Sequence, residues 1–399
     1  MPAPAPPAAE VAKTAEDRVR DDFVVYEQLR GHKGQVLCVS ASNPKGGEAL
    51  VATGAEDSTV RLWDLGGGSD IGSPSATPAC LSGSIPTSWS KPRVVLCICR
   101  CFDGEPVSSV VFGPGGADRL YCSAGSKVFH FDLLAGRKSG LLLMAPTGVF
   151  DDGSEEVNEV AVHPKGEYLA AADDSGVVKI FNTRTRRLHK ILRNAHASIC
   201  NTVRFRPRTS WDVASGALDS TLVLWDFNSG RTRKRVNLAE DAAASAASKS
   251  NTSGHQLFNP PFVHSVDFTP DGRYLAAGLG DSGVVIFDAK TWRLVGRCDG
   301  HSAPVSQVHY PVFETSLLIS TGNDRRLVFW DHRPFERPPG AASSTNSSIA
   351  AADLRLDKGR RKSQPFNACL PINDSIREGS IAQQHQKPQP KAGKKKKGR

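Results

Sequence analysis

The chain repeats one alternation of apolar and polar residues six times. In each copy a short strand-like run, a polar turn and a second run ending in an aromatic residue follow one another. The clearest copies are LVATGAEDSTVRLWD (50–64), DVASGALDSTLVLWD (212–226) and LLISTGNDRRLVFWD (317–331). Looser copies are RLYCSAGSKVFHFD (119–132), YLAAADDSGVVKIFN (168–182) and YLAAGLGDSGVVIFD (274–288). Another apolar alternation precedes each copy, so the pattern predicts at least three β-strands per unit and an all-β fold.

The spacing of the copies indicates a β-propeller. The closing aromatic residues fall at positions 63, 131, 181, 225, 287 and 330, and a period of ~40–45 residues is typical of four-stranded propeller blades. The two longest intervals contain low-complexity stretches, which predict loop insertions at 66–90 and 239–256. We expect the propeller to occupy residues 22–333, after a disordered segment over 1–21 and before a mostly disordered basic tail over 334–399.

The repeats resemble those of the WD40-repeat family over residues ~30–333. The resemblance rests on Gly-His at 31–32 and 300–301, Ala-His at 195–196, and Trp-Asp at 63–64, 225–226 and 330–331. Further stretches at 172–182, 237–241 and 256–265 resemble one subfamily of these proteins. The resemblance implies a WD40 β-propeller whose surfaces bind other molecules.

The number of blades stays open at this stage. Six blades can be counted, and FVVYEQL (23–29) is interpreted as the outer strand of the final blade, which would close the ring. The resembled family implies a seventh blade, for which FNACLPINDSI (366–376) is a short, incomplete remnant. We therefore expect either closure at six blades or a seven-blade-like ring with an incomplete last blade.

Composition and charge exclude several classes of protein. Hydrophobic residues make up 39% of the chain, and its nine cysteines are odd in number and lack metal-ligand spacing, so free thiols in a reducing compartment are expected. The first residues contain no apolar core of a secretory signal, and no apolar run approaches the ~18–20 residues of a membrane span. The net charge of +9 is concentrated in the tail, since KAGKKKKGR (391–399) alone contributes six positive side chains.

Three repeats contain serine or threonine, aspartate and histidine at fixed offsets from tryptophan. A hydrolase site would rarely occur three times in one chain, whereas a buried hydrogen-bond network in each blade needs this repetition. The resemblance to WD40 proteins implies that histidine bridges the hydroxyl and the aspartate, with the indole as a further member. The sets are His32, Thr53, Asp57 and Trp63; His196, Ser215, Asp219 and Trp225; and His301, Ser320, Asp324 and Trp330.

Two other motifs imitate catalytic or metal sites. Gly280-Asp281-Ser282-Gly283 resembles a protease nucleophile loop, but the near copy at 173–176 indicates a tight turn. Cys97, Cys99 and Cys101 alternate, as thiols on one face of an outer strand of the first blade would. No phosphate-binding or zinc-protease motif is present, so we expect neither catalytic activity nor a cofactor or metal.

The ending Trp330-Asp331-His332-Arg333 is the sharpest functional candidate. A Trp-Asp-x-Arg ending resembles that of WD40 substrate receptors, which dock on the DNA-damage-binding adaptor of cullin-4 ubiquitin ligases. Arg333 could then anchor to carbonyls or carboxylates of the adaptor, and Arg184 in Phe-Asn-Thr-Arg is a weaker copy. The alternative interpretation is an exposed arginine after a strand.

Basic residues support a second functional hypothesis, an RNA- or chromatin-associated scaffold. Such runs are usual on solvated sheet edges, where they prevent strand pairing, but they also fit an acidic partner or a nucleic-acid backbone. The tail is interpreted as an import signal, an RNA contact or a solubilising segment. We expect a nuclear and cytoplasmic protein that is monomeric outside complexes. The residues are Arg184, Arg186, Arg187, Lys190 and Arg193; Arg231, Arg233, Lys234 and Arg235; and Lys394, Lys395, Lys396, Lys397 and Arg399.

Overall fold

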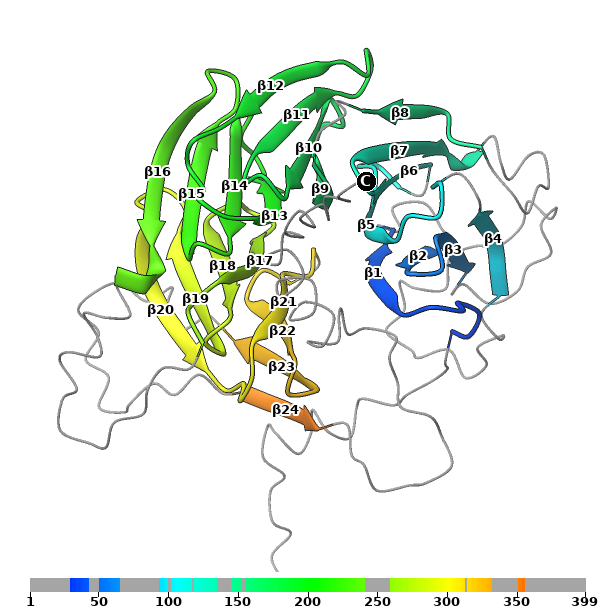
Figure 1. Ribbon diagram of the computed structural model, residues 1–399. Helices are drawn as coiled ribbons and strands as arrows, with labels where there is room; N and C mark the ends of the chain where they lie inside the picture. Colours follow the sequence, from blue (N-terminus) through cyan, green and yellow to red (C-terminus); the bar gives the residue numbers. More distant parts are fainter. Residues whose placement is uncertain are drawn as a thin grey trace, which may run out of the picture.

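Six four-stranded antiparallel sheets follow one another around a ring, one for each repeat (Figure 1). This arrangement confirms the predicted all-β propeller. The computed structural model describes residues 29–42, 50–64, 93–99, 102–116, 118–134, 145–151, 155–240, 259–312, 314–331 and 351–355. In every sheet the strands are adjacent in chain order, from the innermost to the outermost.

The first three blades are built from twelve strands. Blade 1 contains β1 (Val36–Ala41), β2 (Leu50–Ala55), β3 (Thr59–Asp64) and β4 (Arg93–Cys99). Blade 2 contains β5 (Val107–Phe112), β6 (Arg119–Ala124), β7 (Lys127–Asp132) and β8 (Gly148–Phe150). Blade 3 contains β9 (Val157–Val162), β10 (Tyr168–Asp173), β11 (Val178–Asn182) and β12 (Leu188–Leu192).

The last three blades complete the described ring. Blade 4 contains β13 (Cys200–Phe205), β14 (Asp212–Ala217), β15 (Thr221–Asp226) and β16 (Arg231–Asn237). Blade 5 contains β17 (Val263–Phe268), β18 (Tyr274–Leu279), β19 (Gly283–Asp288) and β20 (Arg293–Asp299). Blade 6 contains β21 (Val305–His309), β22 (Leu317–Gly322), β23 (Arg326–Asp331) and β24 (Ala351–Arg355).

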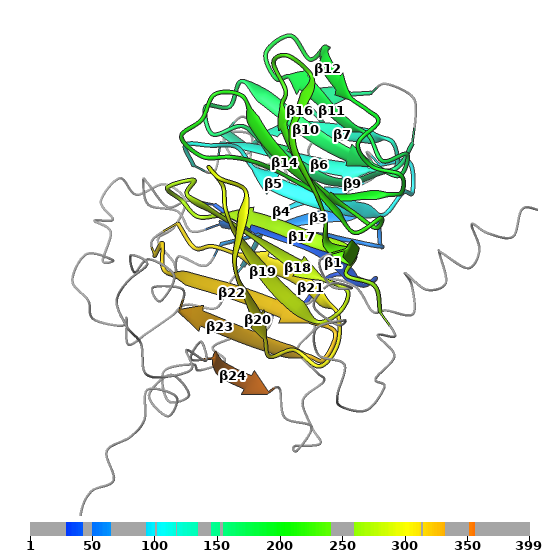
Figure 2. The same cartoon turned by 90° about the vertical axis from the view of Figure 1, so that its left-hand side faces the viewer.

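The outer strand of blade 6 corrects the predicted end of the propeller. β24 pairs antiparallel with β23, from Trp330 opposite Ala351 to Arg326 opposite Arg355, and lies at the edge of the blade in Figure 2. The propeller therefore extends beyond residue 333, into the segment expected to be a tail. Residues 351–355 supply the outer strand of blade 6. Residues 23–28 and 366–376 lie outside the described part of the chain.

The inner strands of neighbouring blades pack side by side, from β1 against β5 through to β17 against β21. Among the described residues, β21 and β1 do not pack in this way. Every residue of β1 is at least partly exposed, whereas β5, β13 and β17 bury their first, third and fourth residues. Within the described residues, direct packing of β21 against β1 thus does not close the ring, and the incomplete seventh blade stays a prediction.

The core lies between blades. Hydrophobic clusters join each blade to the next one, and the second strands β14 and β18 are buried along their whole length. Small residues are required where sheets approach closely: a Cβ on Gly278 would lie 2.7 Å from a methyl carbon of Val305 in the next blade. This face-to-face packing explains why the second and third strands read as apolar runs and the outer strand β16 as a charged one.

Candidate functional site

Blade 4 contains the second of the three histidine sets. The Trp225 indole donates from Nε1 to the Ser215 hydroxyl (2.8 Å), which lies 2.7 Å from Nε2 of His196. The other ring nitrogen, Nδ1, lies 2.7 Å from the Thr221 hydroxyl, which donates to Oδ1 of Asp219 at 2.6 Å. Nδ1 of His196 and Oδ1 of Asp219 are themselves 3.6 Å apart. Thr221, which the sequence pattern did not single out, therefore links the histidine to the aspartate.

Blades 1 and 6 join histidine and aspartate directly. In blade 1, Nδ1 of His32 lies 3.1 Å from Oδ1 of Asp57, and Nε2 lies 2.7 Å from the Thr53 hydroxyl. The Trp63 indole donates to the same hydroxyl at 2.8 Å. The corresponding distances in blade 6 are 3.0, 2.7 and 2.8 Å, made by His301 with Asp324, His301 with Ser320, and Trp330 with Ser320.

The geometry of the three histidine sets indicates a structural role. Ser215 and Ser320 have no exposed surface, so a substrate has no access to their hydroxyls. The aspartates also accept backbone N–H groups from the loop that enters the blade, as Asp57 does from Lys33 and Asp219 does from Ala197, both at 2.7 Å. Each set thus ties the entering loop to the tight turn between the second and third strands.

Burial and hydrogen bonding set the pKa values in blade 1. Burial lowers the pKa of His32, and the contact with Asp57 only partly opposes this effect. Burial acts to raise the pKa of Asp57, but hydrogen bonds from Thr59, the Lys33 N–H and His32 outweigh it, so the pKa of Asp57 is lowered. The arrangement therefore favours a neutral imidazole beside an ionised carboxylate.

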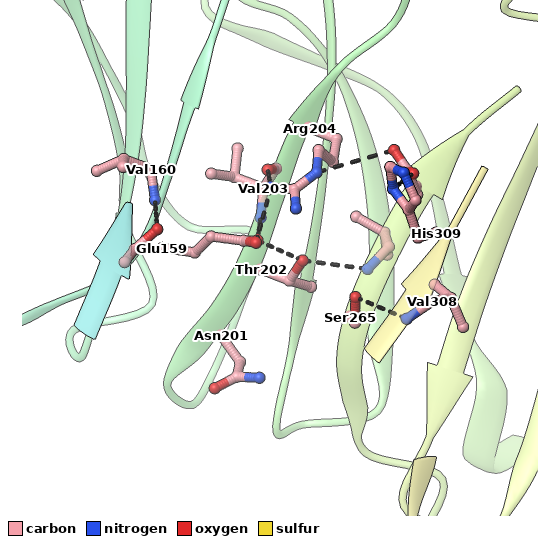
Figure 3. Close-up of polar contacts among 12 residues, drawn as sticks. Glu159, Val160, Asn201, Thr202, Val203, Arg204, Ser265, Val308 and His309 are labelled. Atoms are coloured by element: carbon pink, nitrogen blue, oxygen red, sulfur yellow. Dashed lines mark hydrogen bonds and ion pairs between the residues drawn. The ribbon is translucent and has the colours of Figure 1, made fainter. Parts of the chain in front are cut away.

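A second polar network runs from blade to blade along the inner strands (Figure 3). In four successive blades, the third residue of the inner strand accepts a hydrogen bond from the backbone N–H of the fourth residue in the next inner strand. The pairs are Ser109 with Val160 (3.2 Å), Glu159 with Val203 (2.9 Å), Thr202 with Val266 (3.1 Å) and Ser265 with Val308 (3.3 Å). The network satisfies edge N–H groups that face no further strand.

Charged side chains extend this network around the inner strands (Figure 3). Arg204 lies 2.7 Å from Oε1 of Glu159 and 3.8 Å from Oδ1 of Asp267. The other Asp267 oxygen accepts the Tyr310 N–H at 2.8 Å and lies 3.0 Å from Nδ1 of His309. Sequence reasoning missed these residues because their alternation resembles that of any half-buried strand, and only the position of neighbouring blades brings them together.

The turns between third and outer strands share one geometry. The acid or amide that ends the third strand accepts the N–H of the residue two positions later, as Asn182 does from Arg184 (3.1 Å) and Asp288 does from Lys290 (2.9 Å). Asn182 thus performs the role of the aspartate that it replaces. Arg184 and Lys290 are both exposed.

The predicted docking residues lie at one such turn. Trp330 is buried and bonded to Ser320, and Asp331 ends β23. Arg333 stands two positions after Asp331, as Arg184 and Lys290 do in their turns, and itself lies outside the described residues. The structure therefore describes β23, the strand that precedes this candidate site, and Trp330 and Asp331 at its end.

The basic runs lie at the outer edges of blades 3 and 4. Arg184, Arg186 and Arg187 occupy the turn before β12, Lys190 lies on it, and Arg193 follows it. The first five residues of β16 are exposed. Part of this charge is paired within the blade: Arg233 lies 3.0 Å from Asp212 and 3.1 Å from Asp226, and Arg235 lies 4.0 Å from Asp219. Lys394 to Lys397 lie outside the described residues.

The cysteines match the expectation of thiols. Cys38, Cys122, Cys200 and Cys298, the cysteines whose side chains the structure describes, form no disulfide, and burial raises the pKa of Cys298 to about 12. Cys97 and Cys99 lie on β4, the outer strand of blade 1, while Cys101 falls outside the described residues. The described part of the chain contains neither a metal-binding group of His, Cys, Asp and Glu nor a helix that could span a membrane.

Comparisons with known proteins identify the same repeats in the sequence. The family model "WD domain, G-beta repeat" matches residues 24–64, 145–182, 187–226, 248–288 and 292–331. A WD repeat-containing protein 53 homolog from Dictyostelium discoideum is 30% identical over 77% of this chain and 78% of its own length. VIP3 from Arabidopsis thaliana is 24% identical over 41% of the chain and 49% of its own length. The nuclear distribution protein PAC1 from Arthroderma benhamiae is 26% identical over 44% and 36%, respectively.

Proposed function

The chain belongs to the WD40-repeat family, and from this premise we propose that it is a substrate receptor of a cullin-4 type ubiquitin ligase. In this function the propeller is a non-catalytic scaffold that docks on the DNA-damage-binding adaptor of the ligase and presents a substrate to it. The protein would work in the nucleus and the cytoplasm.

The observation that carries the proposal is the turn geometry shared by the blades. The side chain two positions after the closing acid or amide is exposed in blades 3, 4 and 5, at Arg184, Asn228 and Lys290. In each of these turns the backbone N–H of the same residue donates a hydrogen bond to that acid or amide. Arg333 has the same position relative to Asp331. A guanidinium presented there can donate two parallel hydrogen bonds to a carboxylate or to backbone carbonyls of a partner.

Affinity purification of the full chain with quantitative mass spectrometry tests the proposal. The adaptor should co-purify with the wild type, and Arg333→Ala should reduce its recovery about tenfold, since charge-assisted hydrogen bonds contribute about 1.5–3 kcal/mol. Lys290→Ala is the matched control, because it removes a cation at the same turn position of blade 5. Equal recovery with Arg333→Ala and wild type would remove Arg333 from the interface, and absence of the adaptor from the wild-type sample would remove the receptor function.

A second candidate function is an RNA- or chromatin-associated scaffold. It is favoured by β16, whose first five residues, Arg-Thr-Arg-Lys-Arg, are all exposed. Binding through such an edge and the lysine-rich tail should weaken steeply as salt rises, because phosphate contacts release counterions. Deletion of 391–399 should lower RNA affinity and reduce the salt dependence. Unchanged binding after this deletion would exclude a role for the tail.

A further inference from the structure

Three aromatic rings lie together where blades 3 and 4 meet at their outer parts. Tyr168 opens β10, His189 lies on β12, and Trp211 directly precedes β14. The Tyr168 ring centroid is 4.9 Å from that of His189 and 6.1 Å from that of Trp211. Buried Phe227 packs beneath, 5.3 Å from Tyr168 and 5.4 Å from Trp211. We call Tyr168, His189 and Trp211 the aromatic platform.

The aromatic platform is accessible to solvent. Trp211 is 37% exposed, His189 is exposed, and Tyr168 is half-buried. Leu188, beside His189 on β12, is 40% exposed. Tryptophan is highly buried on average, and Trp211 exposes more than the other described tryptophans, which are at most 7% exposed.

Arg187 and Lys190 lie within two residues of His189 in the chain, and Arg231 begins the outer strand of the blade that contains Trp211; we call Arg187, Lys190 and Arg231 the basic flanks. Arg187 is exposed immediately before β12, and Arg231 is the exposed first residue of β16. The methylene chain of Lys190 lies against Gly230 of blade 4. A Cβ added to that glycine would lie 3.1 Å from Cδ of Lys190. No ion pair joins the basic flanks to a carboxylate within the described chain. Nearby Asp226 is 3.1 Å from Arg233.

The charge and the rings together fit one class of ligand. Rings that stack on unpaired bases, next to cations that neutralise phosphates, are the elements of single-strand recognition. Paired bases would hide the surfaces that stack, and an acidic peptide would use the cations alone. One acidic side chain, exposed Glu167, lies next to Tyr168 in the chain and limits how closely a phosphate can approach from that side.

We infer that the aromatic platform and the basic flanks form a binding site for single-stranded RNA, which rests on the second function proposed above. Unpaired bases stack on Trp211 and His189, and the basic flanks contact the phosphates on either side. Burial and the neighbouring Lys190 lower the pKa of His189, so its ring is neutral at physiological pH and available for stacking.

Fluorescence anisotropy with the full chain and a labelled 12-nucleotide oligouridine tests this site. Trp211→Ala should weaken binding about tenfold while leaving the slope of affinity against salt unchanged, because stacking involves no counterion release. His189→Ala, which changes an exposed side chain, should weaken binding by a smaller factor of about three. Arg231→Gln should lower both the affinity and the salt slope. Leu294→Ala, at a leucine that is 49% exposed on β20 of blade 5, is the matched control and should bind as the wild type does.

Three results would overturn the inference. Wild-type affinity for both Trp211→Ala and His189→Ala, with Arg231→Gln still weakened, would leave RNA binding in place but remove the aromatic platform from it. Equal affinity for the oligouridine and for an RNA duplex of the same length would show that binding does not depend on stacking of unpaired bases. No binding of any RNA by the wild type would remove both this site and the RNA-associated form of the second candidate function. Circular dichroism spectra and melting temperatures of the variants keep loss of folding distinct from loss of stacking.

Discussion

Ser215 shows how much one buried hydroxyl can contribute at the scale of a residue. It has no exposed surface, and it serves both the Trp225 indole and the His196 ring. Ser215→Ala would leave both nitrogens without this partner, and each unsatisfied group costs about 1–3 kcal/mol. We expect the free energy of urea unfolding to fall by that amount or more. Ser229→Ala, at an exposed turn of the same blade, should change it by less than about 0.5 kcal/mol, and an equal loss in the two variants would contradict a structural role for the set.

The same sets predict how stability depends on pH. The pKa of Asp219 is lowered: burial acts to raise it, but hydrogen bonds from the Thr221 hydroxyl and the Ala197 N–H, together with the nearby His196 ring, outweigh burial. A carboxylate with a lowered folded pKa stabilises the protein above its unfolded pKa of about 3.9, and this contribution is lost as pH falls further. The lowered pKa of His32 acts in the same direction from about pH 6.5 downwards, since the unfolded chain binds that proton more readily.

Thermal unfolding of wild type and Asp219→Asn between pH 7 and 3 measures this dependence. The wild type should be the more stable protein by a constant margin above pH 5, and the margin should shrink below pH 4 as the carboxylate is protonated in the unfolded chain. A margin that grows on acidification would contradict an ionised Asp219 in the folded state.

At the scale of the element, the network between inner strands should couple neighbouring blades. Glu159 accepts from the Thr202 hydroxyl and the Val203 N–H and lies beside Arg204. Glu159→Ala should lower the free energy of unfolding by about 1–3 kcal/mol, and Glu159→Gln by less, because the amide keeps one acceptor oxygen. Urea titrations of both variants check this. Glu155→Ala, at an exposed residue just before β9, is the control, and a loss in that variant equal to the loss in Glu159→Ala would argue against the network.

The elements themselves follow closely from the sequence, because period-2 alternation and turn residues are local signals. Blade 2 shows that a blade can form without the histidine set found in blades 1, 4 and 6. It has no such set, and the family model does not match its strands β5 to β7. Its weak copy RLYCSAGSKVFHFD nevertheless forms β6 and β7, so alternation was the more general signal. The link through Thr221 and the inter-blade pairs could not be predicted, because they depend on distances between segments far apart in the chain.

At the scale of the whole molecule, β24 decides where the propeller ends. A chain ending at residue 345 would lack this strand and leave the outer edge of β23 without its partner, whereas a chain ending at 360 retains it. Unpaired strand edges promote association between molecules. We expect the shorter chain to melt at a lower temperature and to aggregate in light scattering, while the longer chain behaves as the full protein does. Identical behaviour of the two truncations would contradict the pairing.

Sequence reasoning placed the end of the propeller at 333 because the chain after it is rich in proline, serine and asparagine. The strand Ala-Ala-Asp-Leu-Arg contains no β-branched or aromatic residue and has a weak strand signal. It is the unpaired edge of β23, a property of the assembled sheet, that gives these five residues a partner. How the ring closes likewise depends on contacts between blades, which the local pattern does not predict.

The measurement that tests the central claim most directly is the affinity of the purified full chain for the purified adaptor, by biolayer interferometry. The account predicts saturable binding by the wild type, a loss of about tenfold or more with Arg333→Ala, and wild-type affinity with Lys290→Ala. Binding that is absent in the wild type, or that is equal in the wild type and Arg333→Ala, would contradict docking through the end of β23.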